Sequence, residues 1–303
     1  IKSCDSKIVL NIFYTYAWEL IGHCEFSLVK ESDEETNCYV SQEVQISTEI
    51  LENLDVYKLN STVLPAGNIT ITYIMSGYLL QSLNSSNENA EDIKRAEQNH
   101  SDLIPGVYEG GAKIWECTHD LIKYMTESCL PAMFEGKRVL DLGCGAGLLG
   151  IYAYKCGARV QFQDYNKDVL EQITMPNVFL NVPKPPVESD LDLKKLKSYL
   201  QFYSGDWSKY AELSETDEKF DVILTSETVY NLSNQPKLLN TLHTKLTTTG
   251  VVLVAAKTYY FGVGGGLRQF EDLIVKDGHF DSKIVWTSSE GMFILFLKTF
   301  FNC

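Results

Sequence analysis

A glycine-rich turn joins a short apolar segment to a helical pattern between Val139 and Gly150, and it carries one acidic residue, Asp141. Glycine permits backbone conformations and close approaches that other residues resist, so a strand, a glycine turn and a helix form a cradle of nucleotide size. Gly145, Gly147 and Gly150 have the spacing of dinucleotide-binding turns, in which a pyrophosphate lies at a helix N-terminus. The Asp141 carboxylate would repel that pyrophosphate. The turn therefore favours S-adenosylmethionine, which has no phosphate and carries an ammonium and a sulfonium group.

A second acidic residue, Asp164, follows an apolar strand pattern and lies nineteen residues after Gly145. In a doubly wound α/β fold, a carboxylate at this place accepts hydrogen bonds from both hydroxyls of a ribose. Gln163 and Tyr165 flank it and would frame an adenosine. The alternative is a surface aspartate that caps the following helix, because Asp is a favoured N-cap residue.

Two later strand ends also carry polar and aromatic residues. Gly205, Asp206 and Trp207 offer a flexible turn, a backbone amide and an aromatic plate, which suit the edge and the face of an adenine. Trp207 is equally compatible with a place in the hydrophobic core. The segment 225–231 places polar side chains at the carboxyl edge of the next strand, where ligands bind in open α/β sheets. This edge is the predicted reaction site.

Two glycine-rich loops complete the set of candidate site segments. The first, 106–118, combines glycine with aromatic and acidic residues, and we expect it to fold over the cofactor as a lid. The second, 259–266, lacks the acidic partner that a nucleotide site needs, and we expect it to face the substrate.

Strand and helix patterns alternate after residue 102, which indicates a parallel sheet with helices on both faces. The predicted fold is an α/β, seven-stranded, doubly wound, Rossmann-like domain over residues 101–303, preceded by an N-terminal extension over residues 1–100. Within the extension, 62–78 has strand character, and 182–198 is predicted to be an exposed insertion in the sheet domain. The predicted strands are 138–142, 159–163, 201–204, 220–226, 251–256, 282–286 and 292–299, and the predicted helices are 113–126, 148–156, 167–180, 236–246 and 267–276.

The chain has 40 acidic and 26 basic residues among 303, which gives a formal net charge of −14. This charge disfavours a nucleic-acid phosphate backbone and would attract a basic protein substrate. The eight cysteines show no metal-ligand spacing and no disulfide framework, and they fit a reducing cytosol or nucleus. The apolar run 8–21 is shorter than the ~20 residues of a membrane span, with a signal peptide as the alternative. We expect a monomer that holds no metal and does not cross a membrane.

Taken together, these segments resemble the protein-histidine methyltransferase family of seven-stranded, S-adenosylmethionine-dependent enzymes. The resemblance is to the members related to the one that modifies a histidine of ribosomal protein uL3, and it covers about residues 101–298. The motifs that carry it are uncommon and occur in the right order along the chain. They are Gly106–Gly111, Ile114–Thr118, Gln163–Asn166, Ser226–Thr228 with Tyr230–Asn231, and Tyr260–Gly266.

The resemblance implies a set of cofactor contacts, a uL3 histidine as substrate, and a cytoplasmic and nuclear location. Two positions depart from the family pattern. Asp206 stands where a glutamate is expected, and the stretch 182–198 lacks the long basic signal of some relatives, which puts nuclear import by that route in doubt. The implied cofactor residues are Ile114, Trp115, Glu116, Cys117, Thr118, Gly143, Gln163, Asp164, Tyr165, Gly205, Asp206, Trp207 and Ser226, to which the glycine turn adds Asp141 and Gly145.

Methyl transfer to histidine needs a neutral imidazole nitrogen, and an imidazole with a pKa of about 6.5 is already mostly neutral at pH 7. We therefore expect positioning to matter more than general-base catalysis. A carboxylate or amide would fix the ring by accepting the hydrogen of its other nitrogen. Glu227 and Asn231 are the candidates, with Tyr230 stacking nearby.

Two alternatives remain open at the level of the sequence. A lysine methyltransferase of the same fold would need a base or a water channel, because its substrate amine starts protonated. A non-catalytic protein that binds a basic ribosomal protein would keep the fold without the chemistry.

Overall fold

The computed structural model describes residues 39–76, 78, 91–99, 101–104, 106–128, 130–182, 196–213, 219–289 and 291–299. Residues 37–303 form one compact unit. Most of the predicted insertion, residues 183–195, lies outside the described residues, as does the apolar run 8–21.

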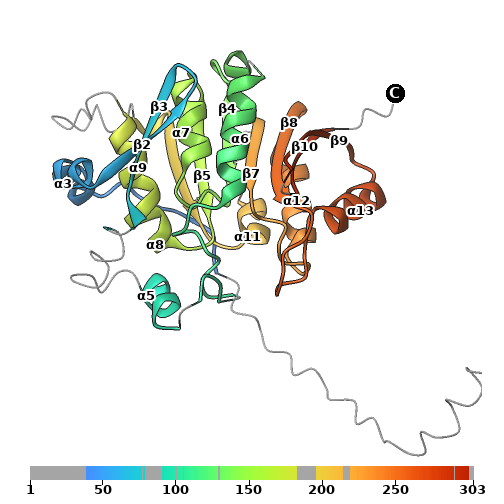
Figure 1. Ribbon diagram of the computed structural model, residues 1–303, viewed down its shortest axis with the longest axis horizontal. Helices are drawn as coiled ribbons and strands as arrows, with labels where there is room; N and C mark the ends of the chain where they lie inside the picture. The colour runs from blue at the N-terminus through green and yellow to red at the C-terminus, as the bar shows by residue number, and fades with distance from the viewer. Residues whose placement is uncertain are drawn as a thin grey trace, which may run out of the picture. The chain divides into compact units, whose positions relative to one another are not determined.

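A mixed sheet forms the centre of this unit (Figure 1). Its strand order is β1-β6-β5-β4-β7-β8-β10-β9, in which the five strands from β6 to β8 are parallel and the other three are antiparallel to their neighbours. The predicted α/β fold is confirmed. The strands are β1 (Gln42–Glu43), β4 (Arg138–Leu142), β5 (Arg159–Asp164), β6 (Leu200–Ser204), β7 (Phe220–Ser226), β8 (Leu246–Lys257), β9 (Phe280–Thr287) and β10 (Met292–Thr299).

The predicted count of seven strands needs one correction, because the sheet has eight. The additional strand, β1, pairs antiparallel with β6 through Gln42 opposite Ser204 and Glu43 opposite Tyr203. Two residues carry no periodic pattern, so β1 could not be recognised from the sequence.

Helices cover both faces of the sheet, as neighbouring residues of each strand point to opposite sides. Val139 and Leu224 lie in a core shared with the first helix group, whereas the adjacent Leu140 and Ile223 lie in a core shared with the second. The first group is α6 (Glu116–Glu127), α7 (Leu148–Lys155) and α9 (Met175–Asn181), and the second is α11 (Trp207–Glu212), α12 (Gln235–Lys245) and α13 (Leu267–Asp277).

The helix predicted over 167–180 is present but changes its winding. It begins as α8 (Lys167–Val169), continues as a π-helical turn over Leu170–Thr174 and ends as α9. The wide turn brings the Thr174 hydroxyl to the Gly145 carbonyl, to which it donates a hydrogen bond at 2.6 Å. A π-turn often marks a functional segment, and here it supports the glycine turn.

The described part of the N-terminal extension packs on the same unit. It contains α2 (Thr48–Glu52), α3 (Leu54–Leu59), the hairpin of β2 (Ser61–Ala66) and β3 (Ile69–Ile74), and α5 (Glu91–Gln98). The domain boundary near residue 100 stays a prediction. No helix in the described part of the chain is long and apolar enough to cross a membrane.

Two buried asparagines of α9 hold the hairpin in place. Asn177 accepts a hydrogen bond from the Ile74 amide at 2.8 Å and donates one to the Ala146 carbonyl at 3.0 Å. Asn181 pairs with both backbone groups of Thr72. These bonds satisfy the free edge of β3, which has no strand beyond it in the described residues.

Replacing Asn177 with Ala should lower the free energy of unfolding by about 2–3 kcal/mol. The change leaves the Ile74 amide and the Ala146 carbonyl without their hydrogen-bond partner, and an unsatisfied buried group costs about 1–3 kcal/mol. Urea denaturation measures the effect. The control is Asn99→Ala, whose exposed side chain bonds only the Arg95 carbonyl and whose loss should cost about 0.5 kcal/mol or less. Equal losses for the two variants would contradict the role of Asn177.

Candidate active site

The glycine turn after β4 requires glycine at several positions. Gly143, Gly145 and Gly147 have φ angles of 67°, 48° and 76°, which side chains disfavour. A Cβ on Gly143 would also lie 2.7 Å from the Thr228 side chain. The turn therefore packs closely against the segment that follows β7.

Asp141 supports this turn from inside. Its carboxylate is 1% exposed and accepts a hydrogen bond at 2.8 Å from the Gly150 amide in the first turn of α7. Burial raises the pKa of Asp141 to about 8. The structure thus differs from the interpretation in which this carboxylate faces a cationic ligand, because the unpaired amides at the helix N-terminus attract it instead.

Asp164 lies at the carboxyl end of β5 and binds the same turn. It accepts hydrogen bonds from the Gly145 amide at 2.9 Å and from the Asn166 amide at 3.1 Å. Burial raises the pKa of Asp164 to about 6, although these two backbone bonds counteract the rise. The carboxylate therefore lies beside the cradle, where the sequence places a ribose-binding group.

The segment 106–115 crosses above the glycine turn, as expected of a lid. A Cβ on Gly145 would lie 3.0 Å from the Gly111 carbonyl, so the two backbones are in near contact. Asn166 is fully buried and fastens the segment by bonding the Glu109 amide and the Val107 carbonyl.

Two aromatic side chains attach the same segment at its ends. The Tyr165 hydroxyl donates to the Gly106 carbonyl at 2.9 Å, and the Trp115 indole donates to the Gly110 carbonyl at 3.1 Å. Ile114 lies just before α6, partly buried against the core.

Gln163 connects β5 to the turn after β6. Its side chain is fully buried, donates to the Gly205 carbonyl at 2.8 Å and accepts from the Trp207 indole at 3.0 Å. Asp206 caps α11 through the Ser208 amide and pairs with Lys237 at 2.7 Å. Burial alone would raise the pKa of Asp206, but these partners outweigh burial and lower it. The Asp206 carboxylate is therefore bound by groups of the protein itself. Trp207 lies close to the glycine turn, at 3.6 Å from a Cβ placed on Gly143.

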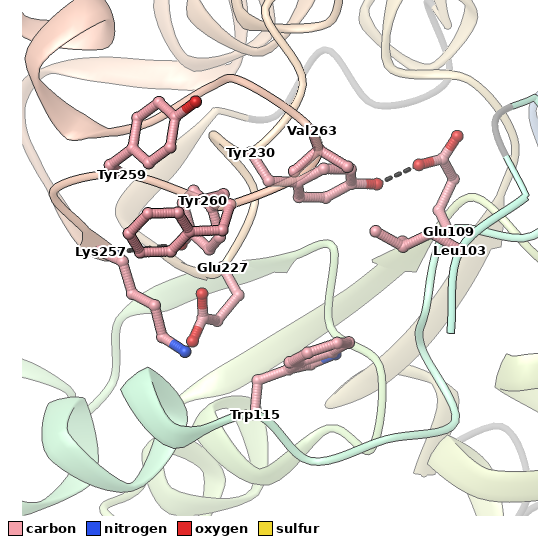
Figure 2. A pocket seen from close by; sticks show the side chains of 10 residues that line it. Leu103, Glu109, Trp115, Glu227, Tyr230, Lys257, Tyr259, Tyr260 and Val263 are labelled. Carbon is pink, nitrogen blue, oxygen red and sulfur yellow. Dashed lines mark hydrogen bonds between the residues drawn. The ribbon is translucent and has the colours of Figure 1, made fainter. Parts of the chain in front are cut away.

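Beside the cradle, a cavity of about 320 Å³ opens between three segments (Figure 2). The lid, the end of β7 and the loop after β8 each contribute to its wall. Half of the lining residues are aromatic, and the others include two carboxylates and one ammonium group. It consists of Leu103, Glu109, Trp115, Glu227, Tyr230, Lys257, Tyr259, Tyr260, Phe261 and Val263.

Glu227 is the strained residue of this cavity. Its φ angle is 60°, and it is the one non-glycine residue with positive φ in the described ranges. Such a conformation costs of order 1–3 kcal/mol and concentrates at functional sites. Its Oε1 accepts from the Cys117 amide at 3.3 Å, and its Oε2 is buried. Figure 2 shows the carboxylate next to the Lys257 ammonium group, and the Tyr260 hydroxyl also interacts with it, so Glu227 belongs to a polar cluster in the cavity wall.

The start of α6 meets the end of β7 at the border between cradle and cavity. The Thr118 hydroxyl donates to the Ser226 hydroxyl at 3.2 Å, and the exposed Glu116 pairs with Lys257 at 2.7 Å. Burial, followed by the nearby Glu227 carboxylate, raises the pKa of the Cys117 thiol, which therefore stays protonated.

The predicted catalytic residues divide into two groups. Glu227 and Tyr230 line the cavity, and the Tyr230 hydroxyl donates to the Glu109 carboxylate (Figure 2). Asn231 does not line it, because its carboxamide oxygen accepts from the Ser233 amide at 3.0 Å and from the Ser233 hydroxyl at 2.7 Å. The prediction for Asn231 is therefore wrong as to position, since local turn bonds hold the side chain.

Sequence reasoning missed Lys257 as a cavity residue and did not assign Tyr260 a position in it. Lys257 ends β8, one residue beyond the predicted strand, so its place at the carboxyl edge was the available signal. Tyr260 belongs to the loop already expected to face a substrate, and that expectation agrees with the cavity lining.

Comparison with known proteins identifies the family. A family model described as lysine methyltransferase matches residues 105–261. The chain is also 41% identical over 259 residues to the histidine protein methyltransferase 1 homolog of Bos taurus, which covers 80% of this chain and 67% of the relative. The chain belongs to this methyltransferase family.

Further relatives have the same name. Those of Rattus norvegicus and Dictyostelium discoideum are 42% and 44% identical over 70% and 63% of this chain, and over 62% and 57% of their own lengths. The chain thus spans about three fifths of the length of these two curated relatives. A T. thermophilus 16S rRNA methyltransferase in complex with AdoMet and guanosine aligns with a TM-score of 0.47 at 16% identity, over 79% of this chain and 50% of that one.

S-adenosylmethionine is the cofactor of this methyltransferase, and the cradle residues fit it. Glycine at 143 lets the turn approach Thr228 and Trp207 closely, because a Cβ there would lie 2.7 Å from Thr228 and 3.6 Å from Trp207. Asp164 offers a carboxylate for the ribose hydroxyls, and Ser226 with Thr118 offers hydroxyls at the border to the cavity. The bound cofactor supplies an electrophilic methyl group.

Affinity for S-adenosylhomocysteine should fall about 10-fold between pH 8 and pH 5. We expect the ribose hydroxyls to donate to the ionised Asp164, whose pKa of about 6 means that this acceptor is lost as the pH falls through 6. Isothermal titration calorimetry measures the dissociation constant. Asp164→Asn should bind more weakly at pH 8 with a flatter pH profile, while Asp55→Asn, on the surface of α3, should behave as wild type. An unchanged slope in Asp164→Asn would refute the assignment.

Proposed function

We propose that this protein is an S-adenosylmethionine-dependent protein methyltransferase that modifies a ring nitrogen of histidine. The observation that carries the proposal is the Glu227 carboxylate in the wall of a cavity rich in aromatic side chains, beside the cofactor cradle. A planar imidazole fits between aromatic walls, and one of its nitrogens carries a hydrogen that a carboxylate can accept.

Glu227 would act by positioning the ring. An N–H bonded to the Glu227 carboxylate fixes the tautomer and leaves the other ring nitrogen with a free lone pair directed away from the carboxylate. That nitrogen forms a bond to the methyl carbon as the carbon–sulfur bond breaks, and positive charge passes to the ring. The Glu227 carboxylate stabilises this charge, and the N–H proton leaves afterwards to water.

A lysine substrate is the second candidate, and the name of the matching family model favours it. A lysine ammonium would enter a cavity that already holds the Lys257 ammonium group. Its proton would have to be lost before transfer, at a cost set by a pKa of about 10.4. The imidazole needs no such step, and the curated relatives are named for histidine.

For the substrate protein we propose a basic ribosomal protein, with uL3 as the first candidate, encountered in the cytoplasm and nucleus. The net charge of −14 supports a basic partner. The test is incubation of the purified protein with isolated ribosomal proteins and labelled S-adenosylmethionine, followed by mass-spectrometric mapping. Methyl groups on a uL3 histidine support the proposal. Methyl groups on lysine would replace it, and failure to bind the cofactor would favour a non-catalytic binder.

Glu227→Gln should lower kcat with the protein substrate roughly 100-fold, because the neutral amide no longer stabilises the charge that develops on the ring. The dissociation constant for S-adenosylhomocysteine should remain at the wild-type value. Steady-state kinetics and calorimetry separate these effects, and Glu127→Gln on the exposed side of α6 is the matched control. Wild-type kcat in Glu227→Gln would remove this residue from the mechanism.

The cavity mouth carries exposed apolar side chains suited to the polypeptide around the target histidine. Phe261 is 93% exposed, and its ring packs edge-on against Tyr259. Backbone bonds from the Gly264 amide to Tyr260 and from the Gly265 amide to Tyr230 hold this loop. A fixed, exposed aromatic residue beside a reaction cavity is typical of a binding contact.

Phe261→Ala should raise KM for the intact protein substrate about 5- to 20-fold and leave kcat nearly unchanged, because truncation of an aromatic anchor removes binding that is equal in the ground and transition states. Initial-rate kinetics against substrate concentration give both constants. Leu59→Ala, at an 83% exposed position of α3, is the control for loss of an exposed apolar side chain. A fall in kcat at unchanged KM would contradict the docking role.

A further inference from the structure

The segment 39–44 borders the turn that follows β6. The Val44 amide donates to the Phe202 carbonyl at 2.8 Å, Gln42 lies opposite Ser204, and the Asp206 amide donates to the Tyr39 carbonyl at 3.0 Å. The segment therefore runs antiparallel to β6 and continues past its carboxyl end. It lies outside residues 105–261, the range matched by the family model.

The contact between the two backbones is very close at Gly205. A Cβ there would lie 2.6 Å from the Ser41 Cα and 2.7 Å from the Val40 carbonyl oxygen. Gly205 also has a φ angle of 112°, which other residues disfavour. Glycine at this position is thus required by the N-terminal segment and by the turn, and the segment is a fixed part of this edge.

This edge is the adenosine end of the cofactor site. Gln163 bonds both the Gly205 carbonyl and the Trp207 indole, and the Gly205 amide donates to the Asp164 carbonyl at 3.0 Å. The sequence suggested that an amide of this turn binds adenine, but the Asp206 amide is already bonded to Tyr39. The N-terminal segment therefore engages one amide of this turn, that of Asp206.

The Tyr39 side chain continues an aromatic surface next to the ribose-binding acid. Its ring centroid lies 4.9 Å from that of Tyr165, with the rings inclined at 62°. Tyr165 directly follows Asp164 and is held from the other side by the Gly106 carbonyl. Tyr39 is 38% exposed, and its hydroxyl interacts with Asp92 of α5.

We propose that Tyr39, together with the backbone at Ser41, forms the outer wall of the adenosine end of the cofactor site. The Tyr39 carbonyl fixes the turn after β6, and its ring contacts the adenosine of S-adenosylmethionine or S-adenosylhomocysteine beside Tyr165. The extension thereby completes a site of which the matched range supplies only part. Base–aromatic contacts of this kind change affinity by about 5- to 100-fold when the ring is removed.

The test compares Tyr39→Ala, Tyr39→Phe and Val40→Ser in the full chain, with S-adenosylhomocysteine as the probe. Val40 is 76% exposed on the same segment and is the matched control. Calorimetry should give a dissociation constant about 10-fold higher in Tyr39→Ala and within twofold of wild type in the other two. The ligand-free Tm, measured in parallel, separates binding from folding.

Two outcomes would overturn the proposal. Wild-type affinity in Tyr39→Ala would show that the ring does not contact the ligand. Equal losses in Tyr39→Ala and Val40→Ser, accompanied by equal falls in ligand-free Tm, would show that the segment acts through stability alone. The probe needs no protein substrate, so these results are independent of whether histidine or lysine is methylated.

Discussion

The buried carboxylate of Asp164 is the group on which the rest of the site depends. It binds the Gly145 amide of the cofactor turn and the Asn166 amide at the start of α8. Asn166 in turn holds the lid through Glu109 and Val107, and it holds α5 through Asp92 at 3.0 Å. Since buried polar groups must be paired, one acidic side chain sets the positions of three segments that are distant in the sequence. The cradle and its cover are therefore a single hydrogen-bonded assembly.

The order of strands and helices could be predicted because buried parallel strands are apolar and lie between amphipathic helices. β4 and β7 have the predicted bounds. β8 begins before its apolar run because Leu246 pairs with Phe220, and the register shifts before Val251 pairs with Val222. The edge strand β1 gave no signal, since its two residues are held by backbone bonds to β6 that any sequence could make.

The sequence predicted which strand ends form the site, but it predicted the directions of their side chains less well. Asp141 and Asp164 have the same type and similar places at neighbouring strand ends, but one turns beneath the glycine turn and the other lies beside it. Asn231 and Glu227 are four residues apart, and only Glu227 reaches the cavity. The backbone torsion angles determine these side-chain directions, and the torsion angles cannot be derived from the residue types alone.

The backbone conformation and the contacts of Glu227 restrict which residues this position can accept. A φ angle of 60° is tolerated best by glycine, asparagine and aspartate. Glycine has no carboxylate, and the aspartate side chain is one methylene shorter than the glutamate side chain that reaches the Cys117 amide. The backbone favours one kind of residue, and the contact with Cys117 favours another. A substitution that relaxes the backbone at this position is therefore expected to lose that contact.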